Sequence, residues 1–160
     1  MNILVLYFSR SGNTRKLAEA FCEGVENVEG FRTLLRSTEE VTAEEFASAD
    51  GIIAGSPVYF GSMAAELKSV FDKFVTVRRK MEGKPGAAFA TSGDGSGGKE
   101  TTIISIIQAM LIYGMIIVGD PMSATGHYGT ACKGVPDERT IDNAKLHGRR
   151  VAEVAKMLRA

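Results

Sequence analysis

The segment Ser9–Thr14 has the residue types of a phosphate-binding loop. It reads Ser-Arg-Ser-Gly-Asn-Thr and joins the apolar run Ile3–Phe8 to a stretch with helical periodicity. The first N–H groups of a helix have no partner within the helix and lie at the positive end of its dipole. Hydroxyl groups and a glycine let a phosphate approach the backbone closely. The segment therefore predicts a phosphate site, with an ordinary helix capped by Ser11 or Asn13 as the alternative.

The same segment differs from two better-known phosphate loops. It has no lysine in the pattern GxxxxGK[ST], so it is not the loop of a nucleotide-hydrolysing enzyme. It also lacks the spacing GxGxxG of a dinucleotide-binding turn. The interpretation that remains is a site for the single phosphate group of a small cofactor.

Two later segments have the composition of ligand-binding loops. Ser56–Met63 reads Ser-Pro-Val-Tyr-Phe-Gly-Ser-Met, in which the adjacent Tyr59 and Phe60 offer aromatic surface to a ligand. Thr91–Gly98 has four glycines in eight residues, so its backbone N–H groups can reach the edge of a ligand. Both segments follow short apolar runs, as the first loop does.

The composition is that of a globular protein with no dominant charge. The 160 residues suffice for one domain with a sizeable core, and 44% hydrophobic and 24% charged residues are ordinary values. The 19 basic and 19 acidic side chains cancel. This balance argues against nucleic acid as the main partner, because such binding depends on neutralising phosphates.

The cysteines and the apolar stretches predict a cytoplasmic protein that does not insert into a membrane. Cys22 and Cys132 form no metal-binding pattern, so we expect two free thiols in a reducing compartment and no metal site. The apolar start has no basic region or cleavage site of a signal peptide. The stretch Ile103–Val118 is interrupted by Gln108 and Gly114 and is shorter than the roughly 20 residues of a membrane span.

Hydrophobic periodicity divides the chain into alternating strands and helices. A continuous apolar run predicts a buried parallel strand over Asn2–Phe8. Further strands are expected over Phe31–Arg36, Gly51–Gly55, Gly86–Ala90 and Met115–Val118. Apolar residues at helical spacing predict helices over Asn13–Glu26, after Thr42, and over Met63–Phe74, Glu100–Tyr113 and Ile141–Leu158. Local signals include a capping box at Thr42 and Glu45 and a helix-ending glycine at Gly114.

This alternation predicts an α/β fold with a doubly wound parallel sheet and helices on both faces. No repeat or linker interrupts the pattern, so we expect one domain over residues 1–160. Ligands of such sheets bind beyond the carboxyl ends of the strands. The three loops leave the carboxyl ends of the first, third and fourth predicted strands, so we expect them to meet at one edge.

With these loops the sequence resembles the flavodoxin-like flavoproteins, and most closely the WrbA-type NAD(P)H:quinone oxidoreductases and related NADPH-dependent FMN reductases. The first loop matches the phosphate pattern hydroxyl-x-hydroxyl-Gly-x-Thr of flavodoxins. SPVYFGSM resembles the second loop of the family, TSGDGSGGKETT and YGMIIVG resemble its third segment, and GHYGTACKG resembles its last flavin-side loop. The resemblance implies a single flavodoxin-like domain with a five-stranded parallel sheet in the order 2-1-3-4-5.

The resemblance also implies FMN as the cofactor and a role for each loop. The phosphate would be held by Ser9, Arg10, Ser11, Gly12, Asn13 and Thr14. The isoalloxazine ring would be lined by Pro57, Val58, Tyr59, Phe60 and Gly61. The pyrimidine edge and the ribityl chain would be approached by Thr91, Ser92, Gly93, Asp94 and Gly97. The candidate catalytic residues near the open face of the flavin are His127 and Tyr128.

Several of these roles have simpler alternatives in the sequence. Tyr59 and Phe60 could be ordinary packing residues. Asp94 lies among glycines, where an aspartate often serves only to stabilise a turn. His127 follows a glycine in a predicted loop, where a lone histidine is often just a polar surface residue. These alternatives stay open at this point.

The function implied is that of an FMN-dependent oxidoreductase. It would accept a hydride from NADH or NADPH and reduce a quinone or a similar small acceptor, with the chemistry supplied by the flavin. The alternative is a flavodoxin that carries single electrons between enzymes. Such carriers are usually strongly acidic, and the zero net charge of this chain disfavours that role.

The apolar residues of the second loop also predict a homo-oligomer, with a dimer as the first choice. Tyr59, Phe60 and Met63 would leave apolar surface around an open cofactor edge, to which Tyr113, His127 and Tyr128 would add. Monomeric proteins seldom expose a large apolar patch, and twofold dimers are the commonest way to cover one. The alternative is a monomer in which the flavin itself fills the gap.

Overall fold

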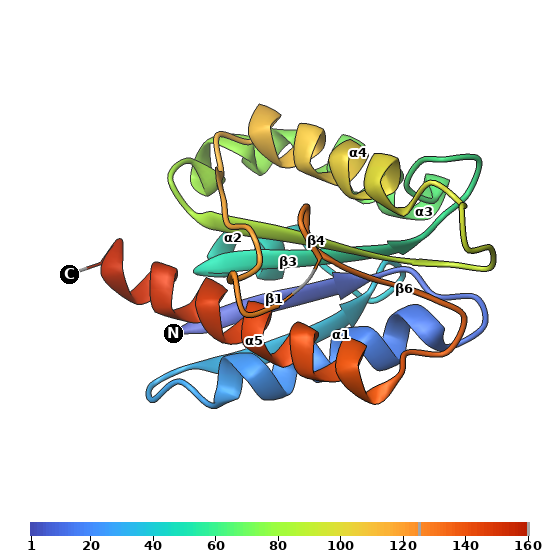
Figure 1. The fold of residues 1–160 in the computed structure, drawn as a ribbon. Helices are drawn as coiled ribbons and strands as arrows, with labels where there is room; N and C mark the ends of the chain where they lie inside the picture. The colour runs from blue at the N-terminus through green and yellow to red at the C-terminus, as the bar shows by residue number, and fades with distance from the viewer. Residues whose placement is uncertain (125, 160) are drawn as a thin grey trace.

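A computed structural model describes residues 1–124 and 126–159 as a parallel sheet between two layers of helices (Figure 1). The strands are β1 (Asn2–Tyr7), β2 (Arg32–Ser37), β3 (Gly51–Pro57), β4 (Pro85–Ser92), β5 (Ile116–Ile117) and β6 (Thr130–Lys133). The helices are α1 (Asn13–Glu26), α2 (Ala43–Ser48), α3 (Ala65–Lys73), the 3-10 helix η1 (Phe74–Met81), α4 (Lys99–Ile112) and α5 (Glu138–Met157).

The strand order β2-β1-β3-β4-β5 and the parallel pairing agree with the prediction. In β1, Ile3 and Val5 pack toward α1 and α5, while Leu4 and Leu6 pack toward α2, α3 and α4. Successive side chains of a strand point to opposite faces, and both faces of this sheet are covered. This explains why the central strands have continuous rather than alternating apolar sequences.

The fifth position of the sheet is divided between two short strands. β5 pairs only with Pro85 and Gly86 at the start of β4, whereas β6 pairs with Phe89–Ser92 at its end. The predicted strand Met115–Val118 is thus shorter than expected, and the predicted flavin-side loop over residues 126–134 contains a sixth strand. The last bond of this ladder runs from the N–H of Val118 to the carbonyl of Gly86, and Pro121, which has no N–H group, follows in the segment that leaves the sheet.

The predicted end of helix α4 at Gly114 is confirmed. At Gly114, φ is 71°, its N–H donates to the carbonyl of Leu111, and the N–H of Met115 donates to the carbonyl of Met110. This is the glycine-ended motif in which a left-handed residue turns the chain and satisfies the last helical carbonyl groups. It releases the chain from α4 in the direction of β5.

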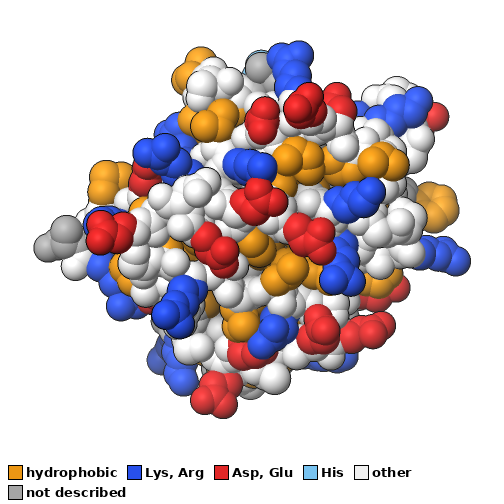
Figure 2. Space-filling model, turned by 90° about the horizontal axis from the view of Figure 1, so that it is seen from below, with side chains coloured by type: hydrophobic (Ala, Val, Ile, Leu, Met, Phe, Trp, Pro, Cys, Tyr) orange, Lys and Arg blue, Asp and Glu red, His pale blue; other side chains and the backbone are white. Residues whose placement is uncertain are grey.

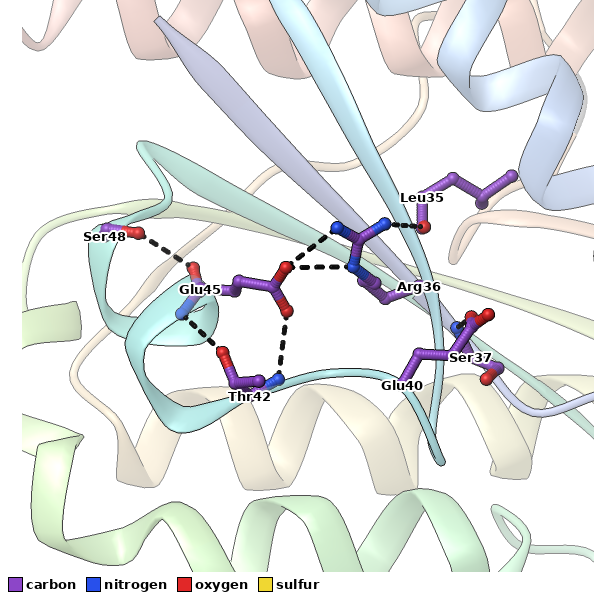
Figure 3. A network of polar contacts seen from close by, with 7 residues as sticks. All are labelled: Leu35, Arg36, Ser37, Glu40, Thr42, Glu45 and Ser48. Carbon is purple, nitrogen blue, oxygen red and sulfur yellow. Dashed lines mark hydrogen bonds and ion pairs between the residues drawn. The ribbon is translucent and has the colours of Figure 1, made fainter.

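The capping box of α2 is confirmed and extends into an ion pair with β2 (Figure 3). The hydroxyl of Thr42 accepts from the N–H of Glu45, and the carboxylate of Glu45 accepts from the N–H of Thr42. The same carboxylate accepts from the Nε and Nη2 atoms of Arg36, at 3.0 and 2.8 Å. These bonds hold the pKa of Glu45 below its usual value and attach α2 to the edge strand of the sheet.

α1 and α5 lie side by side on one face of the sheet because two glycines let them approach closely (Figure 1). A Cβ atom on Gly148 would lie 2.5 Å from the carbonyl oxygen of Phe21, and one on Gly24 would lie 2.0 Å from that of Lys145. The solvent side of this layer carries interspersed basic and acidic side chains (Figure 2). The close contact therefore belongs to the core and not to an interface.

The state of the two cysteine thiols agrees with the prediction. Cys22 and Cys132 are both free, as predicted, and burial raises the pKa of each thiol to about 11. Both therefore remain protonated at neutral pH and are poor nucleophiles.

Among the described residues, no helix is both long and apolar enough to cross a membrane.

The helix contact gives a test of the fold. We expect Gly148→Ala to lower the free energy of unfolding by about 2–3 kcal/mol, because the added methyl group has no space beside the Phe21 carbonyl. Gly119→Ala is the matched control, since nothing lies within 4 Å of its Cβ position, and it should change stability by less than about 0.5 kcal/mol. Urea denaturation measures both; equal losses would contradict the close approach of α1 and α5.

Candidate functional site

The three predicted loops meet at the carboxyl edge of the sheet, on the right-hand side of Figure 1. The hydroxyl groups of Thr14 and Thr91 lie 2.8 Å apart and connect the first loop to the end of β4. The N–H of Val58 donates to the carbonyl of Thr91 at 2.8 Å, which connects the second loop to the third. The rings of Phe8 and Tyr59 pack edge to face at 6.3 Å. The predicted convergence of the loops is confirmed.

The first loop leaves helix α1 without a side-chain cap. Its N-cap residue is Gly12, with φ at 90°, so the alternative of an ordinary helix capped by Ser11 or Asn13 is wrong. The hydroxyl oxygen of Ser9 accepts from the N–H groups of Gly12 and Arg15, at 3.2 and 3.3 Å. This leaves two donors at the positive end of the helix.

Those two donors are the N–H groups of Asn13 and Thr14. Neither has an acceptor among the residues that the structure describes. Gly12 has no side chain that would cover them, and nothing lies within 4 Å of its Cβ position. Unpaired N–H groups at the start of a helix form an anion site.

Buried hydroxyl groups gather at the same edge. Four of them follow or end the strands, at Thr14, Ser56, Thr91 and Ser92, and all are less than 9% exposed. Ser56 accepts from the N–H of Ala64 at 2.8 Å, which fixes the start of α3. A cluster of buried polar groups at one end of an apolar core is costly unless hydrogen bonds satisfy it. Here the bonds lock the three loops to one another.

The second loop presents Phe60 at its tip. Tyr59 and Ser62 exchange two backbone hydrogen bonds of 3.1 Å, and between them Phe60 and Gly61 both have positive φ values, 51° and 76°. The side chain of Phe60 is fully exposed, while Met63 is buried behind it. A bulky residue held in the left-handed region and in solvent is a mark of a functional contact rather than of core packing.

The third loop is braced by Asp94. Its carboxylate accepts from the N–H and the hydroxyl of Ser96, and these bonds hold the pKa of Asp94 below its usual value. The hydroxyl of Ser92 donates to the carbonyl of Asp94 at 2.7 Å. The carboxylate therefore stabilises the turn, which was the simpler of the two sequence interpretations.

Glycine is required where the second and third loops touch. A Cβ atom on Gly98 would lie 3.0 Å from the Cα atom of Gly61, and φ at Gly98 is 68°. Lys99 follows directly, and its ammonium group donates to the carbonyl of Gly95 at 2.9 Å. The third loop is thus held at its middle and at its end.

Residues Gly93, Gly95 and Gly98 have the spacing G-x-G-x-x-G between a strand and a helix. In a dinucleotide-binding unit, an acidic residue about 20 positions later binds the ribose at the same edge. Here Asp120 follows β5, which is paired with the opposite end of β4, and its carboxylate accepts from the N–H of Gly126. The spacing therefore does not build a dinucleotide site of that kind.

His127 and Tyr128 lie away from the three loops. They precede β6, whose first residue pairs with Phe89 in the middle of β4, and Gly129 packs against the carbonyl of Ala88. Both side chains are exposed, and φ at His127 is 64°. The structure therefore places this pair beside the middle of the sheet, and its catalytic role stays a prediction.

The end of β6, and not its beginning, reaches the loops. Lys133 pairs with Ser92, and the N–H of Gly134 donates to the carbonyl of Ser92 at 2.7 Å. A Cβ atom on Gly95 would lie 4.0 Å from the ammonium nitrogen of Lys133. The sequence analysis missed these two residues because it assigned a loop where β6 forms; the signal that points to them is the short run Thr130–Lys133 between two glycines.

Comparison with known proteins places this geometry in a family. The family model of the NADPH-dependent FMN reductases matches residues 1–130. The chain belongs to this family. The NAD(P)H dehydrogenase (quinone) of Archaeoglobus fulgidus is 37% identical, with 98% of each chain covered. The NAD(P)H dehydrogenase (quinone) of Solidesulfovibrio magneticus is 34% identical, with both chains covered completely.

The fold of this family member agrees with a solved structure. The flavodoxin, WrbA-like protein from Agrobacterium tumefaciens has a TM-score of 0.83 at 25% identity, and 98% of each chain is covered. The resemblance to flavodoxin-like flavoproteins, stated from the loops, is thereby confirmed. FMN binding is supported by the family, and the unpaired N–H groups at α1 with the hydroxyl groups beside them fit a phosphate group.

A large apolar cavity adjoins the second loop of this chain. Its volume is about 1040 Å³, and it extends from Tyr59 and Phe60 between α3 and α4 as far as Tyr113. The exposed side chains of Val75 and Ile112 add apolar surface beside it. The hydroxyl of Tyr113 is buried and donates to a carbonyl group of α3, and burial raises its pKa to about 12.

Proposed function

We propose that the chain is an FMN-dependent oxidoreductase that takes a hydride from NADH or NADPH and reduces a quinone or a similar small acceptor. The observation that carries the proposal is the start of α1, where the N–H groups of Asn13 and Thr14 lack acceptors at the edge where three loops converge. Membership in the FMN reductase family and the names of the relatives support it. Residues 1–160 would then form one FMN-binding domain.

The protein would bind and orient the cofactor and leave the redox chemistry to it. FMN, when bound, supplies a ring system that accepts a hydride and passes the electrons on. The two N–H groups of α1 offer donors to a phosphate dianion, and the hydroxyl group of Ser11 adds a third. The hydroxyl group of Thr14 adds a fourth where it accepts from Thr91 and so keeps its own proton for the phosphate. Arg10, which is exposed in the same loop, adds positive charge. Ser9 contributes indirectly, because its oxygen already holds the loop in shape.

We assign the ring system to the second and third loops. Tyr59 and Phe60 offer aromatic surface, and the backbone of Gly93 offers hydrogen-bonding groups without a side chain in the way. Asp94 would act through the shape of its turn. The further lining residues that we propose are Pro57, Val58, Gly61, Thr91, Ser92 and Gly97.

The phosphate assignment is tested by removing two hydroxyl groups. We expect Ser11→Ala with Thr14→Ala to weaken FMN binding at least tenfold, because each hydrogen bond to a dianion is worth about 1.5–3 kcal/mol. Fluorescence titration of the ligand-free protein measures the dissociation constant. Ser48→Ala is the control, since that hydroxyl lies on α2 and bonds only to the carbonyl of Glu45. An unchanged constant in the double variant would refute the assignment, and FAD should bind more weakly than FMN.

Turnover separates the enzyme from the flavodoxin-type carrier. The chain has 19 basic and 19 acidic residues, whereas a carrier steered to basic partners needs a strongly acidic surface. We therefore expect the FMN-loaded protein to oxidise NADH or NADPH steadily when a quinone is the only acceptor. Absorbance at the nicotinamide band under anaerobic conditions measures this. If neither nicotinamide reduces the flavin and a stable one-electron form accumulates instead, the carrier is the correct interpretation.

The unpaired thiols support a reducing location. Cys22 lies on α1 and Cys132 on β6, and both thiols are free. Proteins of oxidising compartments commonly use their cysteines in disulfides. We therefore propose the cytoplasm as the location.

We further propose that the chain acts as a homodimer through the layer of α3 and α4. α4 carries apolar residues on its solvent side as well as its core side, with Ile104, Leu111 and Ile112 exposed. The cavity beside it opens next to Phe60, so a second copy seated there would lie against the proposed flavin site. A helix that is apolar all round is normally buried. The opposite layer, of α1 and α5, carries many basic and acidic side chains interspersed with hydrophobic ones (Figure 2).

Sedimentation equilibrium tests the dimer. We expect the FMN-loaded protein to sediment at twice its mass of 17.1 kDa at micromolar concentration. Leu111→Lys should shift it to the monomer, because a desolvated charge in an apolar interface costs several kcal/mol. Met157→Lys is the matched control, since that exposed side chain lies at the end of α5. A single 17.1 kDa species of the unaltered protein would refute the dimer.

A further inference from the structure

A buried imidazole lies at the break in the fifth position of the sheet. His147 of α5 is completely buried. Its Nε2 atom lies 3.0 Å from the carbonyl oxygen of Val118, directly after β5, and its Nδ1 atom lies 3.4 Å from the hydroxyl oxygen of Thr130, the first residue of β6. One side chain thus touches the chain where it leaves the sheet and where it returns.

The partners of the ring determine its protonation. A carbonyl oxygen only accepts, so Nε2 carries the proton and donates to Val118, and Nδ1 is left to accept from the hydroxyl of Thr130. Burial lowers the pKa of His147. The charged groups that face the ring are Asp120, which favours protonation, and Arg150, which opposes it. The ring is therefore neutral and serves as a donor on one side and an acceptor on the other.

A second set of bonds braces the residues between β5 and β6. Arg150 donates to the carbonyl of Asp120 at 3.5 Å, and the carboxylate of Asp120 accepts from the N–H of Gly126 at 2.8 Å. Arg150 of α5 thus holds Asp120, and Asp120 in turn holds Gly126. β6 has only four residues, so its place beside β4 depends on such outside contacts.

β6 connects His147 to the edge where the three loops meet. From Thr130 the strand runs along β4 until Cys132 pairs with Thr91 and Lys133 pairs with Ser92. Thr91 is the residue whose hydroxyl bonds to Thr14 of the first loop. The ladder therefore transmits the position of Thr130 to two of the three loops.

We propose that His147 is a positioning residue of the ligand site: by accepting from Thr130 it fixes β6 against β4, and β6 in turn fixes Thr91 and Ser92 at the carboxyl edge. This inference rests on the proposed function, in which FMN binds between the three loops. His147 itself touches none of the residues assigned to the cofactor. Its contribution is to hold the wall from which Thr91 reaches Thr14.

Two substitutions separate the two sides of the imidazole. His147→Asn keeps an oxygen near the Nδ1 position, facing Thr130, whereas His147→Gln keeps an amide near the Nε2 position, facing Val118. If the ring acts through β6, the Gln variant should bind FMN about fivefold more weakly, the effect of one lost hydrogen bond. The Asn variant should bind within about twofold of the unaltered protein. A purely structural role predicts no such difference.

Thr130→Val removes the hydroxyl group that donates to His147 and keeps the volume of the side chain. It should weaken FMN binding as much as His147→Gln, and the two changes together should be no worse than either alone, because both remove the same bond. It also carries the test if the histidine variants do not fold. Equal and undiminished FMN affinity in Thr130→Val and His147→Gln would overturn the proposal.

Hydrogen exchange distinguishes a failure of this inference from a failure of the proposed function. In the protein without FMN, the amides of Ala131–Lys133 should exchange faster in His147→Gln, while those of β2 keep their rates. If the unaltered protein binds no FMN but this local change appears, the FMN site is wrong and the positioning of β6 stands. If exchange rises equally in every strand, His147 only stabilises the whole fold and the proposal is refuted.

Discussion

The parallel pairing of β1, β3 and β4 is the constraint on which the rest of the structure depends. Each of these strands is paired with another strand on both sides and has a helix layer on both faces, so its direction and register are fixed by the core. Because all three run the same way, their carboxyl ends lie at one edge. The strands therefore determine where the loops that follow them lie, independently of the loop sequences. A binding site at this edge therefore requires only that the loops carry residues able to contact a ligand.

Those loop residues are mainly small, and this has a physical reason. Contacts between backbone groups fix the edge: the N–H of Val58 bonds to the carbonyl of Thr91, and Gly98 packs against Gly61. Gly12 has no side chain and leaves the start of α1 uncovered. Short hydroxyl side chains satisfy the buried ends without filling the space above them. Long side chains would lose more conformational freedom on being held in the same place. The edge is thus preorganised, with Phe60 as a large exposed apolar group.

How far the sequence predicts this protein depends on which contacts decide each element. The central strands and long helices follow from hydrophobic periodicity, and the capping box at Thr42 from local hydrogen bonding; all of these appear as predicted. The first loop was recognisable because its chemistry is local to six residues. β6 was not recognised, since Thr130–Lys133 is only four residues long, is marked by no more than a glycine at each end, and pairs with β4, which is distant in the sequence. For the same reason the sequence placed His127 with the loops, although the register of β6 puts it beside the middle of the sheet.

The division of the fifth position has a consequence for the behaviour of the protein in a crowded solution. An uninterrupted edge strand offers a row of free N–H and C=O groups on which a strand of another molecule can add. Here that edge consists of two residues and then four, separated by a segment that departs at Pro121 and is tied back to α5. Neither piece is long enough to align a foreign strand. This break thus protects this side of the sheet against edge-to-edge aggregation.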